Sequence, residues 1–187
     1  QTLAGSYPGS LRASSADPGD AALTVHACRA PFAHPAAFVS TDVPAMATIL
    51  DSVAKGERGE AFTGIGGTRA PRVAFFFDGN GAYSATATRE LFDTQPLFRA
   101  TLERCAELLQ PHLSGSLLEA LFPSQGQPRA IDVVELGLAA AFAIVYSLAI
   151  MWMAWGVRPA VLTGHGNGEL TAACVADILS LEDATLL

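Results

Sequence analysis

The chain has 187 residues, of which half are hydrophobic and only 16% are charged. This composition predicts a packed core, with room for one domain and a smaller second one. Eighteen acidic residues against 11 basic ones give a net charge of -7, which argues against nucleic acid or an anionic membrane surface as the partner.

The first part of the chain predicts a tail and then a small layered unit. Residues 1–20 are rich in Gly, Ser, Ala and Pro and show little apolar periodicity, which predicts a flexible tail. Over residues 21–71 we expect a small α+β linker domain. Its expected elements are strands over 23–28, 36–40 and near 60–64, and a helix over 43–55 between an Asp42 cap and a Gly56 stop.

The second part, residues 72–187, predicts an α/β domain. The apolar run 73–77 is followed by Asp78-Gly79-Asn80-Gly81, which is typical of a buried parallel strand that opens into a glycine turn. Further expected elements are helices over 89–92, 96–110 and 117–122, a long helix from an Asp132 cap to residue 155, a strand over 159–163, a helix over 169–176, and a helix that starts with a capping box at Ser180. Strands separated by helices predict a parallel sheet.

Residues 136–155 form a run of twenty residues without a charge, long enough to span a bilayer. The run is rich in Ala and Gly, and no basic flank suited to a membrane surface follows it. We therefore interpret it as a buried core helix.

The cysteines and histidines lack the spacing of metal ligands. Cys28, Cys105 and Cys174 are far apart and form no CxxC pair, so we expect buried thiols in a reducing compartment. The histidines His26, His34 and His112 also show no ligand spacing, and we expect no metal site.

The most informative motif is V-L-T-G-H-G-N-G-E at residues 161–169. An apolar strand ends at His165, the chain turns at Gly166, and a helix begins near Asn167. Enzymes with this strand–turn–helix pattern, the nucleophile elbow, carry Ser at the middle position, where the strained turn exposes the hydroxyl. Since that position is Gly166 here, the motif predicts an acyl-transfer scaffold without its nucleophile.

Six blocks of sequence in the same order resemble the linker and the first part of the acyltransferase domain of modular polyketide synthases. The blocks are A-L-T-V-H-A-C-R-A-P-F-A-H (22–34), R-V-A-F-F-F-D-G-N-G-A (72–82), R-E-L-F-D-T-Q-P-L-F-R (89–99), C-A-E-L-L-Q-P-H-L (105–113), W-G-V-R-P-A-V-L-T-G-H (155–165) and G-E-L-T-A-A-C-V-A-D-I-L-S-L-E-D-A (168–184). Each block is weak alone, and their shared order makes the resemblance specific.

The resemblance implies a partial α/β-hydrolase-like parallel sheet with helices, preceded by a small α+β linker domain. In the family, the Ser of G-H-S-x-G attacks a malonyl- or methylmalonyl-CoA thioester, and the acyl group moves to the phosphopantetheine thiol of an acyl carrier protein. A distant His activates the Ser, an Arg pairs with the substrate carboxylate, and backbone N–H groups of a G-Q-G loop and of the residue after Ser bind the oxyanion.

The departures from the family pattern gather at the catalytic pocket. The Ser position is Gly166, the G-Q-G loop has Asn80 in the middle, a following Gln is replaced by Tyr83, and the Gln of a T-Q-P motif aligns with Leu138. The family's catalytic His and substrate Arg lie beyond the elbow helix, on sequence outside these 187 residues. We therefore expect no catalytic residue and a vestigial pocket. Its members are Gly79, Asn80, Gly81, Leu138, His165, Gly166 and Asn167.

Three hypotheses for function remain open. The first is an inactive, truncated acyltransferase-like domain that is a structural scaffold or docking platform in a polyketide synthase, so that the parent assembly is an enzyme and this chain itself is not. The second is a malonyl/methylmalonyl-CoA:acyl carrier protein acyltransferase fragment, active only with a complementing half and a restored Ser at Gly166. The third is a membrane-associated protein that uses residues 136–155.

We favour the first hypothesis, with a cytoplasmic location and without cofactor, metal or membrane. The expected partners are the ketosynthase and other domains of the synthase, and an acyl carrier protein or a trans-acting acyltransferase are further candidates. Half an α/β domain cannot cover both faces of its sheet, so the long apolar helix and the strands near Val73 and Val161 should bury against something. We therefore expect large exposed apolar patches on the isolated chain, and hence a partner or self-association.

Overall fold

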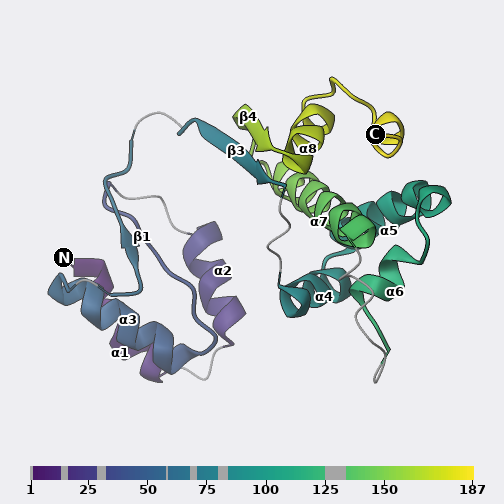
Figure 1. The fold of residues 1–187 in the computed structure, drawn as a ribbon. Helices are drawn as coiled ribbons and strands as arrows, with labels where there is room; N and C mark the ends of the chain where they lie inside the picture. The colour runs from purple at the N-terminus through teal and green to yellow at the C-terminus, as the bar shows by residue number, and fades with distance from the viewer. Residues whose placement is uncertain are drawn as a thin grey trace. The chain divides into compact units, whose positions relative to one another are not determined.

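The computed structural model describes residues 2–13, 17–28, 33–57, 59–67, 71–79, 84–124 and 134–187. The chain divides into two compact units, residues 1–71 and residues 72–187. Among the described residues, the first unit holds three helices and a two-stranded antiparallel sheet, and the second holds a two-stranded parallel sheet with helices packed against it (Figure 1).

The first unit is built around α3 (Val43–Lys55), against which α1 (Thr2–Ala13) packs. The expected boundaries of α3 are confirmed. The Asp42 side chain accepts a hydrogen bond from the Ala45 N–H at 2.7 Å, and the helix ends at Gly56, whose φ of 73° is a left-handed conformation that glycine adopts without strain. β1 (Ala36–Ala37) and β2 (Phe62–Thr63) pair in antiparallel fashion and fall within the strand regions expected from the sequence.

Two expectations for this unit differ from the structure. The expected flexible tail contains α1, whose Pro8 is among the most buried side chains of the chain. The strand expected over residues 23–28 lies in the helix α2 (Pro18–Cys28). A helix start explains the second difference: Pro18 occupies the first helical position, and the Asp17 carboxylate accepts a hydrogen bond from the Gly19 N–H at 2.7 Å.

The second unit is organised by β3 (Val73–Asp78) and β4 (Pro159–His165), which pair in parallel with Phe75 opposite Leu162 and Asp78 opposite His165. The expected parallel sheet is thereby confirmed. Side chains alternate between its two faces. Phe75, Phe77 and Leu162 contact one apolar cluster together with residues of two helices, so this face of the sheet is its inner face.

The other elements in the described part of this unit are helical. They are α4 (Ala85–Thr94), α5 (Pro96–Leu109), η1 (Gln110–His112), α6 (Leu117–Leu121), α7 (Val134–Ala154), α8 (Asn167–Val175) and α9 (Leu181–Ala184). α7 lies between the sheet and α5, and α8 packs against both α7 and the strands (Figure 1). The capping box at Ser180 is confirmed, since its hydroxyl accepts a hydrogen bond from the Asp183 N–H. The expected Asp132 cap lies outside the described residues.

The long apolar helix α7 meets the length and composition of a membrane span. Its buried side chains lie in clusters shared with α5, with the sheet and with the C-terminal helices, and Ala140, Ala143 and Ile144 are at most 2% exposed. Residues that contact protein in several directions around a helix are typical of a core helix. The structure therefore supports the interpretation as a core helix.

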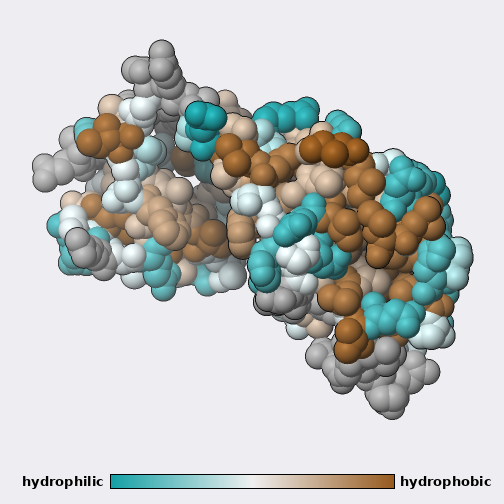
Figure 2. Space-filling view, turned by 45° about the horizontal axis from the view of Figure 1, so that its top comes forward, coloured by the Kyte–Doolittle hydropathy of each residue, from teal (hydrophilic) through white to brown (hydrophobic). Residues whose placement is uncertain are grey.

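The outer face of the sheet carries apolar side chains that the described elements leave exposed. Phe76 is 68% exposed and Val161 is 50% exposed, and each lies one position from a residue of the inner face. Figure 2 shows large brown areas on the surface of the unit formed by residues 72–187. Apolar side chains on the strands are therefore exposed as expected, whereas most of the long helix is buried.

Candidate functional site

The candidate site lies where the carboxyl ends of the two parallel strands meet. Asp78, the last residue of β3, is opposite His165, the last residue of β4. Each strand then enters a glycine turn, at Gly79 and at Gly166. Ligands of open parallel sheets bind outside this edge of the strands, so the sequence motif and the fold indicate the same place.

The turn at Gly166 has the backbone of a nucleophile elbow. Its φ is 56° and its ψ is -127°, a conformation that costs a residue with a Cβ about 1–3 kcal/mol. The residue is exposed, and a Cβ built on it would meet no atom of the described residues within 4 Å. Position 166 therefore has space for a side chain, but glycine has no side chain to place there.

Three glycines let backbone segments at the elbow approach one another closely. A Cβ on Gly168 would lie 2.0 Å from the Phe77 carbonyl oxygen, and a Cβ on Gly79 would lie 2.3 Å from the His165 carbonyl oxygen and 2.5 Å from the Asn167 nitrogen. A Cβ on Gly164 would lie 2.2 Å from the Gly168 carbonyl oxygen. All four distances are far below a van der Waals contact, so only glycine fits at these three positions.

A long-range hydrogen bond joins the elbow to α7. The Asn167 side chain donates its Nδ2–H to the Leu138 carbonyl oxygen at 2.8 Å. The two residues are 29 positions apart, so this contact fixes the start of α8 against the first turns of α7. The Leu138 side chain is 49% exposed.

The structure brings together most of the vestigial pocket expected from the sequence. His165 ends β4, Gly79, Gly166 and Asn167 follow the two strand ends, and the Leu138 backbone joins them through Asn167. Asn80, Gly81 and Tyr83 lie outside the described residues. Gly164 and Gly168 were not among the expected site residues, although the G-H-G-N-G spacing carries the signal that could have found them.

Comparison with known proteins identifies the family to which this chain belongs. The family model of the acyl transferase domain matches residues 74–187. The chain belongs to the acyl transferase domain family.

Relatives of this acyl transferase domain are polyketide synthases. Polyketide synthase GfsE of Streptomyces halstedii is 39% identical over 167 residues, which are 89% of this chain and 4% of that protein. Erythronolide synthase EryA2 of Saccharopolyspora erythraea is 38% identical over 166 residues, 88% of this chain and 5% of that protein. The chain therefore spans a small fraction of the length of these multidomain relatives.

A solved acyltransferase domain has the same fold over nearly all of this chain. The acyltransferase domain from module 8 of the salinomycin polyketide synthase superposes with a TM-score of 0.82 at 33% identity. The match covers 97% of this chain and 43% of that one. The chain therefore corresponds to less than half of the solved domain.

Two titratable residues of this acyl transferase domain, Asp78 and His165, lie opposite each other at the strand ends. His165 is exposed. Within the described ranges, no group of three His, Cys, Asp or Glu side chains could hold a metal ion. An open groove between α4 and the end of α6 is lined by Arg89, Asp93 and Phe122 among others, and it contains none of the pocket residues.

The titratable groups with shifted pKa values lie away from the elbow. Burial raises the pKa of the Cys105 thiol to about 12, and burial also raises the pKa of Cys174. Both are buried free thiols as expected, whereas Cys28 is exposed because α2 carries no buried residue. The expectation for Cys28 was therefore wrong.

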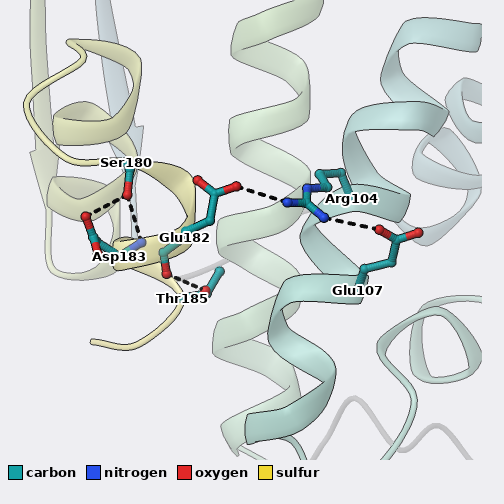
Figure 3. A network of polar contacts seen from close by, with 6 residues as sticks. All are labelled: Arg104, Glu107, Ser180, Glu182, Asp183 and Thr185. Carbon is teal, nitrogen blue, oxygen red and sulfur yellow. Dashed lines mark hydrogen bonds and ion pairs between the residues drawn. The ribbon is translucent and has the colours of Figure 1, made fainter.

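An ion-pair network connects α5 with the C-terminal helix α9 (Figure 3). The Arg104 guanidinium lies 3.0 Å from the Glu182 carboxylate and 3.5 Å from that of Glu107. A backbone hydrogen bond and the Arg104 pairing lower the pKa of Glu182. Next to it, the Ser180 hydroxyl donates to the Asp183 carboxylate at 2.7 Å and caps α9. All of these side chains are exposed, so the network orients α9 more than it stabilises the fold.

Proposed function

We propose that this chain is a catalytically inactive acyltransferase-like domain that is a structural scaffold or docking platform within a cytoplasmic polyketide synthase. The observation that carries the proposal is the elbow itself. Its backbone has the conformation that would present a nucleophile, and residue 166 has no side chain. Covalent acyl transfer needs a nucleophile and a base that activates it, and removing triad members lowers the rate by several orders of magnitude.

The packing at the elbow supports a structural role. The close approach of Gly168 to Phe77 and the bond from Asn167 to the Leu138 carbonyl hold the sheet edge, α7 and α8 together. These contacts need no reactive group at position 166. They would maintain the shape of an acyltransferase surface for the neighbouring ketosynthase, for an acyl carrier protein or for a trans-acting acyltransferase.

A loading assay tests the absence of catalysis. The purified chain is incubated with radiolabelled malonyl-CoA or methylmalonyl-CoA and an acyl carrier protein, and the salinomycin module 8 domain is the positive control. We expect no covalent label on the chain and no transfer above the blank. The variant Gly166→Ser should also remain unlabelled, because the family's activating His is not among these residues. Label on the unmodified chain would refute the proposal.

A binding experiment tests the platform. The chain is sedimented with the ketosynthase of the same synthase, with a carrier protein and with a discrete acyltransferase, one mixture at a time. A complex in at least one mixture supports the platform. Sedimentation of the chain as a free species in all three mixtures contradicts it.

The second candidate is an acyltransferase fragment that needs a complementing half. It is favoured by the uncovered outer sheet face around Phe76 and Val161, together with the match to 43% of the solved domain. The test combines Gly166→Ser with a polypeptide that carries the remaining part of the salinomycin module 8 domain. Recovery of malonyl transfer supports this candidate, and inactivity of the mixture in which the two pieces have bound each other argues against it.

A further inference from the structure

The two faces of the β3–β4 sheet differ in what covers them. α7 and α8 pack on the inner face, where Ala149 and Val175 join the cluster that contains Phe77. Successive residues of a strand point to opposite faces, so Phe76 and Val161 lie on the outer face, and they are 68% and 50% exposed. Among the described residues, no helix or strand buries these two side chains. The outer face is therefore open to a partner.

The two ends of the sheet carry opposite charges. Arg72 and Arg158 are exposed, and each directly precedes the first residue of a strand, β3 or β4. Asp78, which is also exposed, is the last residue of β3. Six positions of extended chain separate Arg72 from Asp78, a distance of roughly 20 Å. The outer face thus lies between guanidinium groups at the amino end and a carboxylate at the carboxyl end.

This charge pattern is complementary to itself. A two-fold axis at right angles to the strands places two outer faces against each other, with the strands antiparallel, and repeats every contact. When the axis lies at the level of Phe75, midway between Arg72 and Asp78, the Asp78 carboxylate of each copy lies over the Arg72 guanidinium of the other. A carboxylate can accept several hydrogen bonds, so Asp78 can keep a contact within its own chain and still bind this guanidinium. Opposite charges at the two ends therefore favour a second copy of the chain as the partner.

We propose that two copies of the chain associate through the outer faces of their β3–β4 sheets, with antiparallel strands. Stacked sheets lie about 10 Å apart. At this register Phe76 of one copy lies over Ala74 of the other, which is opposite Val161 in the sheet. The small Ala74 side chain leaves room for the phenyl ring, as large and small side chains alternate in a packed interface. Only two strands of each copy take part, so the dimer is weak. The contact does not depend on whether the elbow is catalytic.

A charge exchange in the full chain tests the proposed contact. Arg72→Asp leaves a carboxylate at both ends of β3, and Asp78→Arg leaves a guanidinium at both ends. Each variant alone should dimerise about tenfold more weakly than the parent chain, because like charges then face each other. An equimolar mixture of the two variants should form a heterodimer, because the opposite charges meet again. The double variant Arg72→Asp/Asp78→Arg should dimerise like the parent.

Sedimentation velocity at protein concentrations of about 5–500 µM covers the range of a weak dimer, and far-UV circular dichroism checks that each variant is folded. The matched control is Lys55→Asp, an exposed position of the other unit, which changes the net charge as Arg72→Asp does and should leave dimerisation unchanged. Phe76→Ser should weaken the dimer, because it removes the apolar contact.

Three results would overturn the proposal. They are a parent chain that stays monomeric at all concentrations, a dimer that the two single charge variants do not weaken, and an equimolar mixture of those variants that stays monomeric. A fourth concerns another occupant of the same face. If the parent chain stays monomeric and Phe76→Ser weakens its binding to the remaining part of the salinomycin module 8 domain, the outer face binds that polypeptide and the proposal is wrong.

Discussion

The close contact between Gly168 and β3 predicts a large difference between two alanine substitutions only two residues apart. In Gly168→Ala the new Cβ lies 2.0 Å from the Phe77 carbonyl oxygen and 3.1 Å from the Phe77 Cβ. Backbone atoms must move to relieve this overlap, and we expect a loss of about 3 kcal/mol or more. In Gly166→Ala the new Cβ has no atom of the described residues within 4 Å. The expected loss of stability is therefore only the cost of holding alanine at a φ of 56°, about 1–3 kcal/mol.

The assay is urea unfolding followed by tryptophan fluorescence. Both tryptophans, Trp152 and Trp155, lie in the unit formed by residues 72–187, so the signal reports this unit alone. The control is Gly115→Ala, whose Cβ would lie an ordinary 3.8 Å from a Leu136 methyl group, and it should change stability by less than about 0.5 kcal/mol. If Gly168→Ala is no more destabilising than Gly166→Ala, the argued packing of α8 on β3 is incorrect.

Three further predictions concern the thiols, the α9 network and the exposed sheet face. Since burial raises the Cys105 pKa from 9.0 to about 12, its contribution to stability is complete below pH 9 and is lost as the pH rises towards 12. Urea unfolding between pH 8 and 11 should show this loss in the parent chain and a smaller one in Cys105→Ala, with Cys28→Ala as the unaffected control. The pKa of Glu182 is lower in the folded protein than its ordinary value of 4.5, so its ionised carboxylate contributes fully to folding stability above about pH 4.5. That contribution to stability is lost as the pH falls through the pKa that Glu182 has in the folded protein. The protection factors of the α9 amides, which correct for the slower intrinsic exchange in acid, should therefore fall in acid, and Glu182→Gln should remove that fall. Phe76→Ser should reduce binding of a hydrophobic dye with little change in the urea midpoint, because Phe76 is 68% exposed; an unchanged dye signal would mean that the outer sheet face is not the apolar patch.

Local signals made much of the fold predictable from the sequence. Asp42 and Gly56 delimit α3, the apolar run at 73–77 is β3, and the Ser180 capping box starts α9. In each case the residues that start or end the element lie within a few positions of it in the sequence. The local sequence is therefore enough to predict the element. The helix α1 was missed because its stability depends on contact with α3, which no local pattern records. At α2, a start signal at Asp17 and Pro18 outweighs the β-branched residues that follow.

The candidate site was predictable in outline because its two halves carry the glycine turns of parallel strands. The G-H-G-N-G motif located the elbow, and the strand pattern placed Gly79 beside it. The Asn167 contact with the Leu138 carbonyl could not be predicted, because a bond to a backbone oxygen 29 residues away leaves no mark on the residue type at position 138. The restriction of Gly164 and Gly168 to glycine also becomes visible only when the distances to the neighbouring backbone are known.

The pairing of β3 with β4 has a consequence for the order in which the second unit folds. Phe75 is opposite Leu162, 87 positions later in the chain, and α4 to α7 lie between them. Pairing over such a separation costs more loop entropy than helix contacts between neighbours in sequence and slows folding. On a ribosome, the contact of α5 with α7 becomes available before β4 has emerged. We therefore expect the helical layer to form first and the elbow, which needs both strands, to be among the last parts to acquire its shape.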